Sequence, residues 1–262
     1  MTQKVIQAIL HNPADLIHRL HQSPEIVSTR MKRDQLIKSI PHWLYIGDTA
    51  LHLAAAALNL QAVKLLLKAG ADAKAENRRG ATPLHYSCDP RPALSSVWNP
   101  KEQVAIIHLL LQHDANINHA DRGGATPLHR AVRAHSSEAV QQLLKASAEV
   151  DSKLGKQQST PLHLAVHSTG AGGTAGATDE QIKIIRLLLQ YGANRQRPMQ
   201  QEKARTMLHA TSASAKPWQA LKFQSIQTRP DLAKMQKEYR FQPPPFPSAP
   251  ARESTARSCL RL

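Results

Sequence analysis

The stretch Thr82-Pro83-Leu84-His85 decides the fold, because the same pattern recurs along the chain in register with other features. The first residues of successive copies are separated by 33, 44, 34 and 46 positions, so two intervals match a period near 33 and two exceed it by 11 and 13. A fixed period of this size is typical of stacked structural repeats. The other copies are Thr49-Ala50-Leu51-His52, Thr126-Pro127-Leu128-His129, Thr160-Pro161-Leu162-His163 and the weaker Thr206-Met207-Leu208-His209.

Each copy is followed by the same order of features. A short Ala-rich segment comes first, then an amphipathic segment that ends in a Leu pair or triplet, as at Leu65-Leu66-Leu67. A turn signal closes each unit, and Gly or Asn at such a point suits the left-handed backbone that ends a helix. The turn signals are Gly70-Ala71-Asp72, Asp114-Ala115-Asn116, Ser147-Ala148-Glu149 and Gly192-Ala193-Asn194.

These motifs resemble the ankyrin repeat, securely over residues 47–198 and weakly over 199–223. The resemblance implies an all-α ankyrin-repeat solenoid of helix-turn-helix repeats, with β-hairpin fingers along one edge and the first helices on a concave face. Thr caps the first helix and Pro fits its first turn, while stacking buries what one helix pair cannot bury alone. The implied domain spans 47–223, with repeats at 47–79, 80–123, 124–157, 158–203 and a degenerate 204–223.

The two flanks differ from the repeats. Residues 1–46 predict an N-terminal helical cap, with helices opened by Asn12 or Pro13 and by Ser23-Pro24-Glu25. A basic amphipathic helix for a membrane or a partner is the alternative for the second segment. Residues 224–262 predict a basic, Pro-rich, disordered tail. A docking site for another domain is the alternative reading of its Pro-rich part.

Two intervals are long because residues are inserted between the two helices of repeats two and four. The second helix of repeat two is expected to start at Asn99, a good cap, and that of repeat four at Thr178, with Gln181 completing a capping box. The insertions, 89–99 and 168–177, either serve binding or are tolerated surface loops. Trp98 favours packing or contact in the first of them.

Composition narrows the classes of function. The chain has 262 residues and a formal net charge of +15, and residues 199–262 contribute eleven Lys or Arg against four Asp or Glu. Aromatic residues are 4%, which argues against sheets that stack RNA bases. Two cysteines, Cys88 and Cys259, exclude a disulfide-stapled fold and a four-cysteine zinc site. No apolar run approaches the roughly 18 residues needed to span a bilayer, so we expect a cytoplasmic protein.

No catalytic, cofactor-binding or metal-binding residues are expected, and we predict that the protein is not an enzyme. The resemblance implies that the motif histidines tie adjacent repeats together. The Gly-rich stretch 170–176 follows a helix and lacks a terminal GK[ST], which argues against a phosphate loop. Cys88 lies in a first helix, where the resemblance implies a small packing residue rather than a nucleophile.

A partner surface follows from the resemblance, since ankyrin repeats usually meet partners at finger tips and exposed positions of the first helices. Six of the implied positions are basic, and a row of Arg suits carboxylates, so an acidic protein or peptide is the expected partner. Ordinary exposed basic residues are the alternative. The candidate partner-binding residues are Glu76, Arg78, Arg79, Asp89, Arg122, Arg130, Arg133, Lys156, Gln157 and His167.

The function expected from the sequence is therefore a non-catalytic protein–protein interaction scaffold or adaptor, acting as a monomer with no cofactor. Binding of nucleic acid or an anionic surface through the basic tail is the alternative, although the tail lacks a known reading motif. Around residues 43–52 the chain is similar to uncharacterised bacterial ankyrin proteins, which implies a bacterial cytoplasm. An effector delivered into a host cell remains open.

Overall fold

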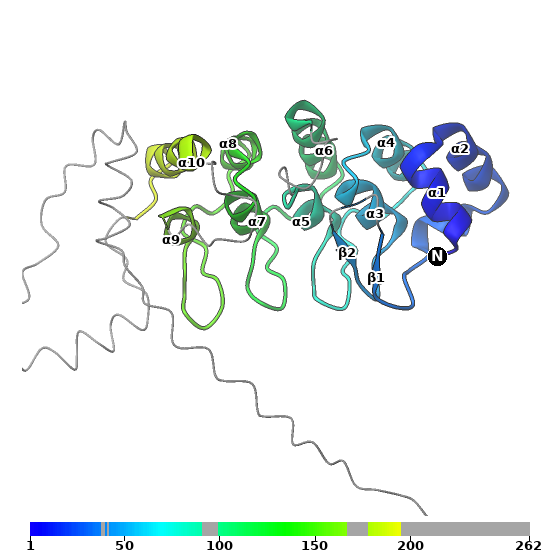
Figure 1. The fold of residues 1–262 in the computed structure, drawn as a ribbon, viewed down its shortest axis with the longest axis horizontal. Coiled ribbons are helices and arrows are strands. Elements are labelled where there is room, and N and C mark those ends of the chain that lie inside the picture. Colours follow the sequence, from blue (N-terminus) through cyan, green and yellow to red (C-terminus); the bar gives the residue numbers. More distant parts are fainter. Residues whose placement is uncertain (38–39, 41, 91–98, 167–177, 195–262) are drawn as a thin grey trace, which may run out of the picture.

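The chain forms a row of stacked helix pairs (Figure 1). The computed structural model describes residues 1–37, 40, 42–90, 99–166 and 178–194. The elements are α1 (Gln3–His11), α2 (Pro13–Gln22), a 3-10 helix η1 (Pro24–Ser28), β1 (Gln35–Leu36), β2 (Trp43–Leu44), α3 (Ala50–Ala56), α4 (Leu60–Lys68), α5 (Pro83–Ser87), α6 (Pro100–Gln112), α7 (Pro127–Arg133), α8 (Ser137–Lys145), α9 (Pro161–Val166) and α10 (Thr178–Gln190).

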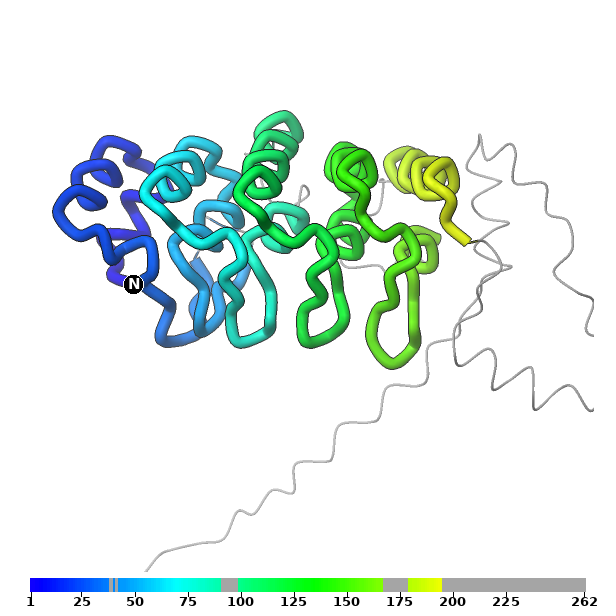
Figure 2. Tube along the Cα trace, turned by 180° about the vertical axis from the view of Figure 1, so that it is seen from behind, coloured from blue at the N-terminus to red at the C-terminus, as the bar shows by residue number. Residues whose placement is uncertain are grey.

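The helices lie in two layers. The first helices of the repeats, α3, α5, α7 and α9, pack on one another in chain order and form the inner layer. The second helices, α4, α6, α8 and α10, form the outer layer in the same way. Extended loops project from one edge between successive repeats, as the view from behind shows (Figure 2). This arrangement confirms the ankyrin-repeat solenoid expected from the motif spacing.

Each described motif starts an inner helix, and Thr49, Thr82 and Thr126 each form a capping box with the His of the same motif. Thr126 is the N-cap of α7, and its hydroxyl accepts a hydrogen bond from the amide of His129. Pro127 occupies the first helical position, where no intrahelical amide bond is lost. Leu128 points into the core with 1% of its surface exposed. Burial of a Leu side chain contributes roughly 1.5–3 kcal/mol, so each motif both starts a helix and anchors its repeat.

All four turn signals that follow the second helices adopt left-handed backbone. The φ angles are +88° at Gly70, +62° at Asp114, +67° at Ser147 and +88° at Gly192. The amide of Ala71 then bonds the carbonyl of Leu66 at 2.9 Å, which satisfies an orphan carbonyl at the helix end. The turn prediction is therefore confirmed in every described repeat.

A second left-handed position lies at the base of each finger, two residues before the motif Thr. Gly47, Gly80 and Gly124 occupy it with φ angles of +91°, +70° and +83°. In the longer finger at 153–159, the third described, Gln158 takes the same conformation, with φ of +56°. A Cβ on Gly124 would lie 2.8 Å from the amide nitrogen of Gly155 in the neighbouring finger. Glycine is needed there both for the backbone angle and for the close approach of two fingers.

The N-terminal segment caps the stack, as expected, but its second half is not a long helix. The helix α2 starts at Pro13, capped by Asn12, whose side chain accepts from the amide of Asp15 at 3.0 Å. The helices α1 and α2 pack on α3 and α4, so they extend both layers. After η1, however, the strands β1 and β2 form an antiparallel hairpin. The amphipathic helix considered for this segment is therefore wrong, because Leu36 and its neighbours pair across strands instead.

The second helices of repeats two and four start close to the predicted points. Asn99 caps α6 and accepts from the amide of Lys101 at 3.0 Å. Thr178 is the first residue of α10. The side chain of Gln181, which the sequence placed in a capping box, is buried, and its amide donates to the carbonyl of Ala165 at 2.7 Å and joins α10 to α9.

Several expectations fall on residues outside the described ranges. These are residues 91–98 of the first insertion with Trp98, the whole second insertion, the site candidate His167, the degenerate fifth repeat with His209, and the tail of residues 224–262 with Cys259.

Candidate functional site

The first two described fingers are shaped by one acidic or amide side chain each. The Oδ1 atom of Asn77 accepts from the backbone amides two and four residues further on, at 2.8 and 3.0 Å. The Oδ1 atom of Asp121 does the same at 2.8 and 2.9 Å. Asx side chains stabilise turns in this way. The finger tips are therefore presented by hydrogen-bonded loops with a repeated geometry.

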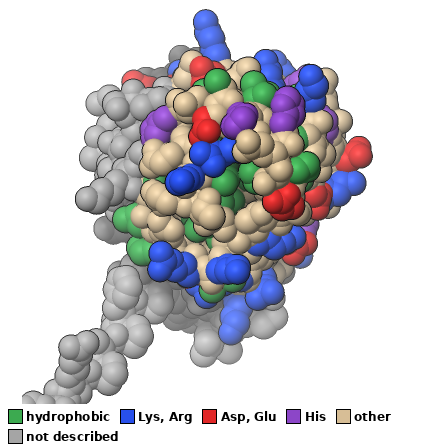
Figure 3. All heavy atoms as spheres, turned by 90° about the vertical axis from the view of Figure 1, so that its right-hand side faces the viewer, with side chains coloured by type: hydrophobic (Ala, Val, Ile, Leu, Met, Phe, Trp, Pro, Cys, Tyr) green, Lys and Arg blue, Asp and Glu red, His purple; other side chains and the backbone are tan. Residues whose placement is uncertain are grey.

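Basic side chains lie exposed on successive fingers. Arg79 and Arg122 are exposed on neighbouring fingers, and the amide of Arg122 donates to the carbonyl of Arg79 at 2.9 Å. Lys156 is exposed on the next finger. In the end view from the N-terminus, Lys and Arg side chains gather along the lower edge of the molecule, where the fingers project (Figure 3). We call Arg79, Arg122 and Lys156 the basic row.

Arg78 was a candidate for the same surface and is exposed, but it already has a partner. Its guanidinium forms a salt bridge with Asp34 of the N-terminal segment, and the two side chains are 50% and 30% exposed. An exposed pair of this kind contributes about 0–1 kcal/mol to stability. Its charge is therefore partly neutralised, while that of its neighbour Arg79 is not met by a carboxylate in the described salt bridges.

Asp89 and Arg130 form a buried cluster rather than a free surface. Asp89, at the end of the first helix of repeat two, accepts from Arg130 at 2.9 Å and from Arg133 at 3.0 Å. The second guanidinium nitrogen of Arg130 donates to Asp121 at 2.6 Å. Arg130 is 16% exposed and Asp89 8%, whereas Arg133 is 44% exposed. Arg130, in repeat three, therefore links Asp89 of repeat two with Asp121 of the finger at 120–125. Of the side chains of Arg130, Asp89 and Arg133, only that of Arg133 reaches solvent appreciably.

The ionisation of this cluster follows from its partners. Burial alone would raise the pKa of Asp89, but His42, Arg133 and Arg130 around it hold that pKa well below its ordinary value. The pKa of Asp121 is likewise lowered, since hydrogen bonds from Arg130 and from finger amides outweigh the effect of burial. Both carboxylates stay charged and paired at neutral pH.

The remaining candidates are placed as follows. Glu76 is 53% exposed and lies 3.4 Å from the imidazole of His119. Gln157 is half-buried in the third finger. The structure thus gathers Arg130, Arg133 and Asp89 into one cluster and leaves the basic row spread over three fingers.

Sequence reasoning missed the part that His42 plays on the inner face. Its ring lies 4.4 Å from that of Tyr86, and its Nε2 atom is 3.7 Å from the carboxylate of Asp89. Tyr86 in turn donates to Asp48 at 2.8 Å. The N-terminal segment therefore covers the end of α5, and no local sequence signal pointed to this contact between residues more than 40 positions apart.

The motif histidines are structural. The Nδ1 atom of His85 accepts from the amide of Thr82 at 3.1 Å, so it carries no proton, and Nε2 donates to the carbonyl of Ala125 at 2.9 Å. His52 bonds Ala81 in the same way at 3.0 Å. The equivalent bond of His129 to the carbonyl of Ser159 measures 3.3 Å. The predicted role of tying adjacent repeats together is confirmed for these three residues.

A reactive cysteine and a metal-binding cluster are two further kinds of chemical site to examine in the described residues. Burial raises the pKa of Cys88 to about 12, so its thiol is not poised as a nucleophile and packs in the core as expected. Within the described ranges no three His, Cys, Asp or Glu side chains converge on a point that could hold a metal ion.

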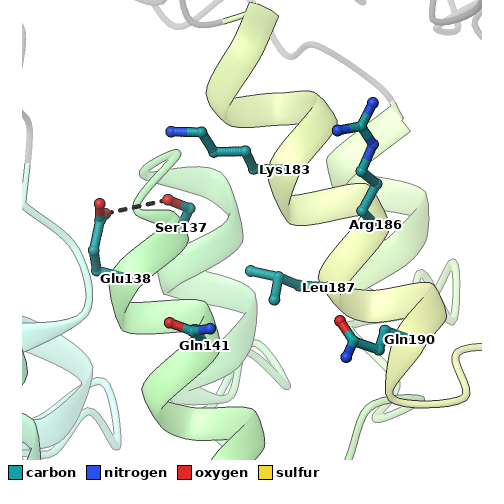
Figure 4. Close-up of a pocket in the computed structure, with 7 residues that line it drawn as sticks. All are labelled: Ser137, Glu138, Gln141, Lys183, Arg186, Leu187 and Gln190. Carbon is teal, nitrogen blue, oxygen red and sulfur yellow. Dashed lines mark hydrogen bonds between the residues drawn. The ribbon is translucent and has the colours of Figure 1, made fainter. Parts of the chain in front are cut away.

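A shallow groove of about 360 Å³ lies between α8 and α10 in the outer layer (Figure 4). Polar side chains such as Gln141 and Lys183 border it, and Leu187 is the apolar member of its lining. Small-molecule sites are mostly apolar and enclosed, so this groove does not have their usual character.

Comparison with known proteins agrees with the architecture. Residues 5–92 and 96–199 match the family model described as ankyrin repeats (3 copies), which covers well over half of the chain and includes part of the N-terminal cap. A search of curated proteins returns no match to the chain. Among the described helices, none combines the length and apolarity that crossing a bilayer requires. The chain therefore belongs to the ankyrin-repeat family, whose members are generally protein–protein interaction modules.

Proposed function

We propose that this protein is a non-catalytic adaptor or scaffold whose fingers and inner face bind an acidic segment of another protein. The observation that carries the proposal is the basic row, since Arg79, Arg122 and Lys156 are exposed on three consecutive fingers. Arg guanidinium groups bind carboxylates in a fixed fork geometry. An acidic partner would thus meet several basic groups along one edge of the molecule.

The distribution of acidic groups supports the same proposal. The carboxylates of Asp89 and Asp121 are both already paired with Arg130. The exposed Glu76 of the first described finger lies 3.4 Å from the imidazole of His119. Arg133 adds a further partly exposed guanidinium beside them. The charge that the surface offers to a partner is therefore positive. Complementary charge of this kind raises association rates and selects partners more than it adds raw affinity.

The test compares proteins retained from a native lysate by three forms of the full chain, each with and without nuclease treatment. The first form is unchanged, the second carries Arg79→Glu, Arg122→Glu and Lys156→Glu, and the third reverses three exposed lysines away from the fingers. That control carries Lys4→Glu, Lys64→Glu and Lys101→Glu, so its net charge matches that of the second form.

We expect a discrete protein that the unchanged chain and the control retain and the finger variant loses. Equal retention by all three forms would contradict the proposal. Loss of all retained material on nuclease treatment would instead favour nucleic-acid binding through the basic tail, residues 199–262. The cytoplasmic location and the monomeric state expected from the sequence remain predictions.

A further inference from the structure

Large exposed apolar side chains gather in the N-terminal hairpin. Leu36 is 52% exposed, Trp43 49% and Ile46 41%, and all three lie within eleven positions of the chain. The other large apolar residues that are comparably exposed in the described ranges, Ile17 and Tyr191, are 39% exposed and lie far from this hairpin along the chain. We call Leu36 and Trp43, which are paired across the hairpin, together with Ile46, two residues beyond β2, the hairpin patch. A cluster of exposed apolar groups indicates a contact surface, whereas single ones need no explanation.

The pairing of the strands explains why this patch faces outward. Leu36 and Trp43 are direct partners in the antiparallel register of β1 and β2, so their side chains lie side by side on one face. The next residue, Leu44, points the opposite way and is fully buried, and Ile37 is 8% exposed. The hairpin is therefore anchored in the core through one face while the other presents apolar groups to solvent.

The hairpin patch is continuous with the basic fingers. The guanidinium carbon of Arg79, the first member of the basic row, lies 4.6 Å from the centre of the Tyr45 ring. The amide of Arg78 donates to the carbonyl of Ile46 at 2.8 Å, which fixes the first described finger against the hairpin. The apolar groups and the first basic groups are therefore held together by backbone and ring contacts.

The charge around the patch selects among possible occupants. Lys32 and Arg33 are exposed in the same segment, and Arg79 is exposed on the first described finger. The acidic Asp34 of this segment is already paired with Arg78. The chain's own tail has an excess of seven positive charges over residues 199–262, and a second copy of the chain has a net charge of +15. Both would bring like charge to this surface, whereas an acidic segment would be attracted to it.

We infer that the hairpin patch seats one large apolar side chain of an acidic peptide segment, whose carboxylates lie along the basic row. This inference rests on the proposed function and adds an anchor to it. Trp is enriched among the residues that contribute most to protein–protein affinity, and basic groups at the edge then fix the direction in which the peptide runs. The partner is thus defined by two features, an apolar anchor and flanking acidic residues.

The experiment selects binders from a displayed library of random 12-residue peptides on the full chain. Enriched peptides are then synthesised with fluorescein and titrated against three further forms. One carries Leu36→Ser with Trp43→Ser, one carries Ile17→Ser with Tyr191→Ser as a matched exposed-apolar control, and one carries the charge reversals of the basic row. Thermal melting curves check that all forms fold.

We expect enriched peptides that combine acidic residues with one Leu, Ile, Phe or Trp. Their affinity should fall at least tenfold for the Leu36→Ser, Trp43→Ser form and stay unchanged for the control. Replacing the apolar residue of the peptide with Ser should weaken binding to the unchanged chain but not to that form. Acidic peptides that need no apolar residue, and that only the charge reversals affect, would overturn the inference and leave the proposed function intact. Enrichment of no acidic peptides would overturn both.

Discussion

The Nε2 atom of His85 lies 2.9 Å from the carbonyl oxygen of Ala125, 40 residues further along the chain. This bond crosses from the first helix of one repeat to the finger of the next, and His52 and His129 repeat it at their own junctions. Each of these imidazoles is buried and must be neutral, because Nδ1 accepts a backbone amide while Nε2 donates. The stack is therefore held at each of these junctions by a buried imidazole that must stay neutral.

The stability of the protein should fall as the pH decreases below about 6.5. Burial lowers the pKa of His85 and of His129 from 6.5 to about 4, and it also lowers that of His52. Because the unfolded chain takes up these protons first, the stabilisation is complete above the unfolded pKa and is lost as the pH falls towards 4. The loss should be on the order of 3 kcal/mol for each of His85 and His129. Urea unfolding between pH 7.5 and 4.5 measures it.

Two variants separate this effect from general acid unfolding. Replacement of His129 by Gln should reduce the slope of unfolding free energy against pH, since one titrating group is gone. The matched control for the substitution is His18→Gln, which replaces an exposed histidine of α2. A flat stability between pH 7 and 5 in the unchanged protein would contradict the structural role of the motif histidines.

Removal of the guanidinium of Arg130 should destabilise the fold strongly. Arg130→Met leaves Asp89 and Asp121 without their shared cation in a buried setting. Breaking a buried ion pair from one side typically costs about 3–5 kcal/mol. The matched control is Arg133→Met, whose side chain is 44% exposed and whose loss should cost only about 1 kcal/mol. Denaturant unfolding at pH 7 measures both costs, and equal costs for the two variants would contradict the role of Arg130 as the shared cation of Asp89 and Asp121.

Gln158→Gly should stabilise the protein. Gln158 has φ of +56° at the position where three other fingers have glycine, and a left-handed non-glycine residue costs about 1–2 kcal/mol. Part of that gain, about 0.5–1 kcal/mol, is offset by the greater freedom of glycine in the unfolded chain. The neighbouring substitution Gln157→Gly relieves no strain and should be neutral or destabilising. Calorimetric melting of both variants tests the difference.

Gly124→Ala, which removes a glycine from a left-handed position, should destabilise the protein. The added Cβ would lie 2.8 Å from the amide nitrogen of Gly155, and φ at Gly124 is +83°. We expect a loss of at least about 1 kcal/mol in unfolding free energy, because backbone of the next finger must move. Gly70 has a similar φ of +88° with nothing within 4 Å of its Cβ position. Gly70→Ala should therefore lose only the free energy of the left-handed backbone angle, with no steric clash. A smaller effect at Gly124 than at Gly70 would mean that the fingers do not pack as described.

Local features of the sequence were predictable, whereas contacts across repeats were not. The motif Thr, Pro and His act within four residues of one another, so helix starts and turns such as Gly70 followed directly from the residues. The hairpin at Leu36 and Trp43 was missed because alternating and helical periods cannot be told apart over so few apolar residues. The pairing of the two strands depends on the core into which Leu44 packs.

In the candidate site, too, local features were predictable and contacts between repeats were not. Exposure of Arg79, Arg122 and Lys156 could be inferred from their place in the repeat. The burial of Arg130 could not, because its two carboxylates lie nine and 41 residues away and meet it only when three elements are assembled. A count of basic residues along one edge therefore overstated the charge available to a partner.

The measurement closest to the proposed function is amide hydrogen exchange of the full chain with and without the protein captured by it. Slower exchange is expected in the fingers at 76–81, 120–125 and 153–159, with the hairpin of β1 and β2 protected together with them. The outer helices α6 and α8 should exchange as in the free chain. Protection confined to those outer helices, or to residues 199–262, would contradict binding along the basic row.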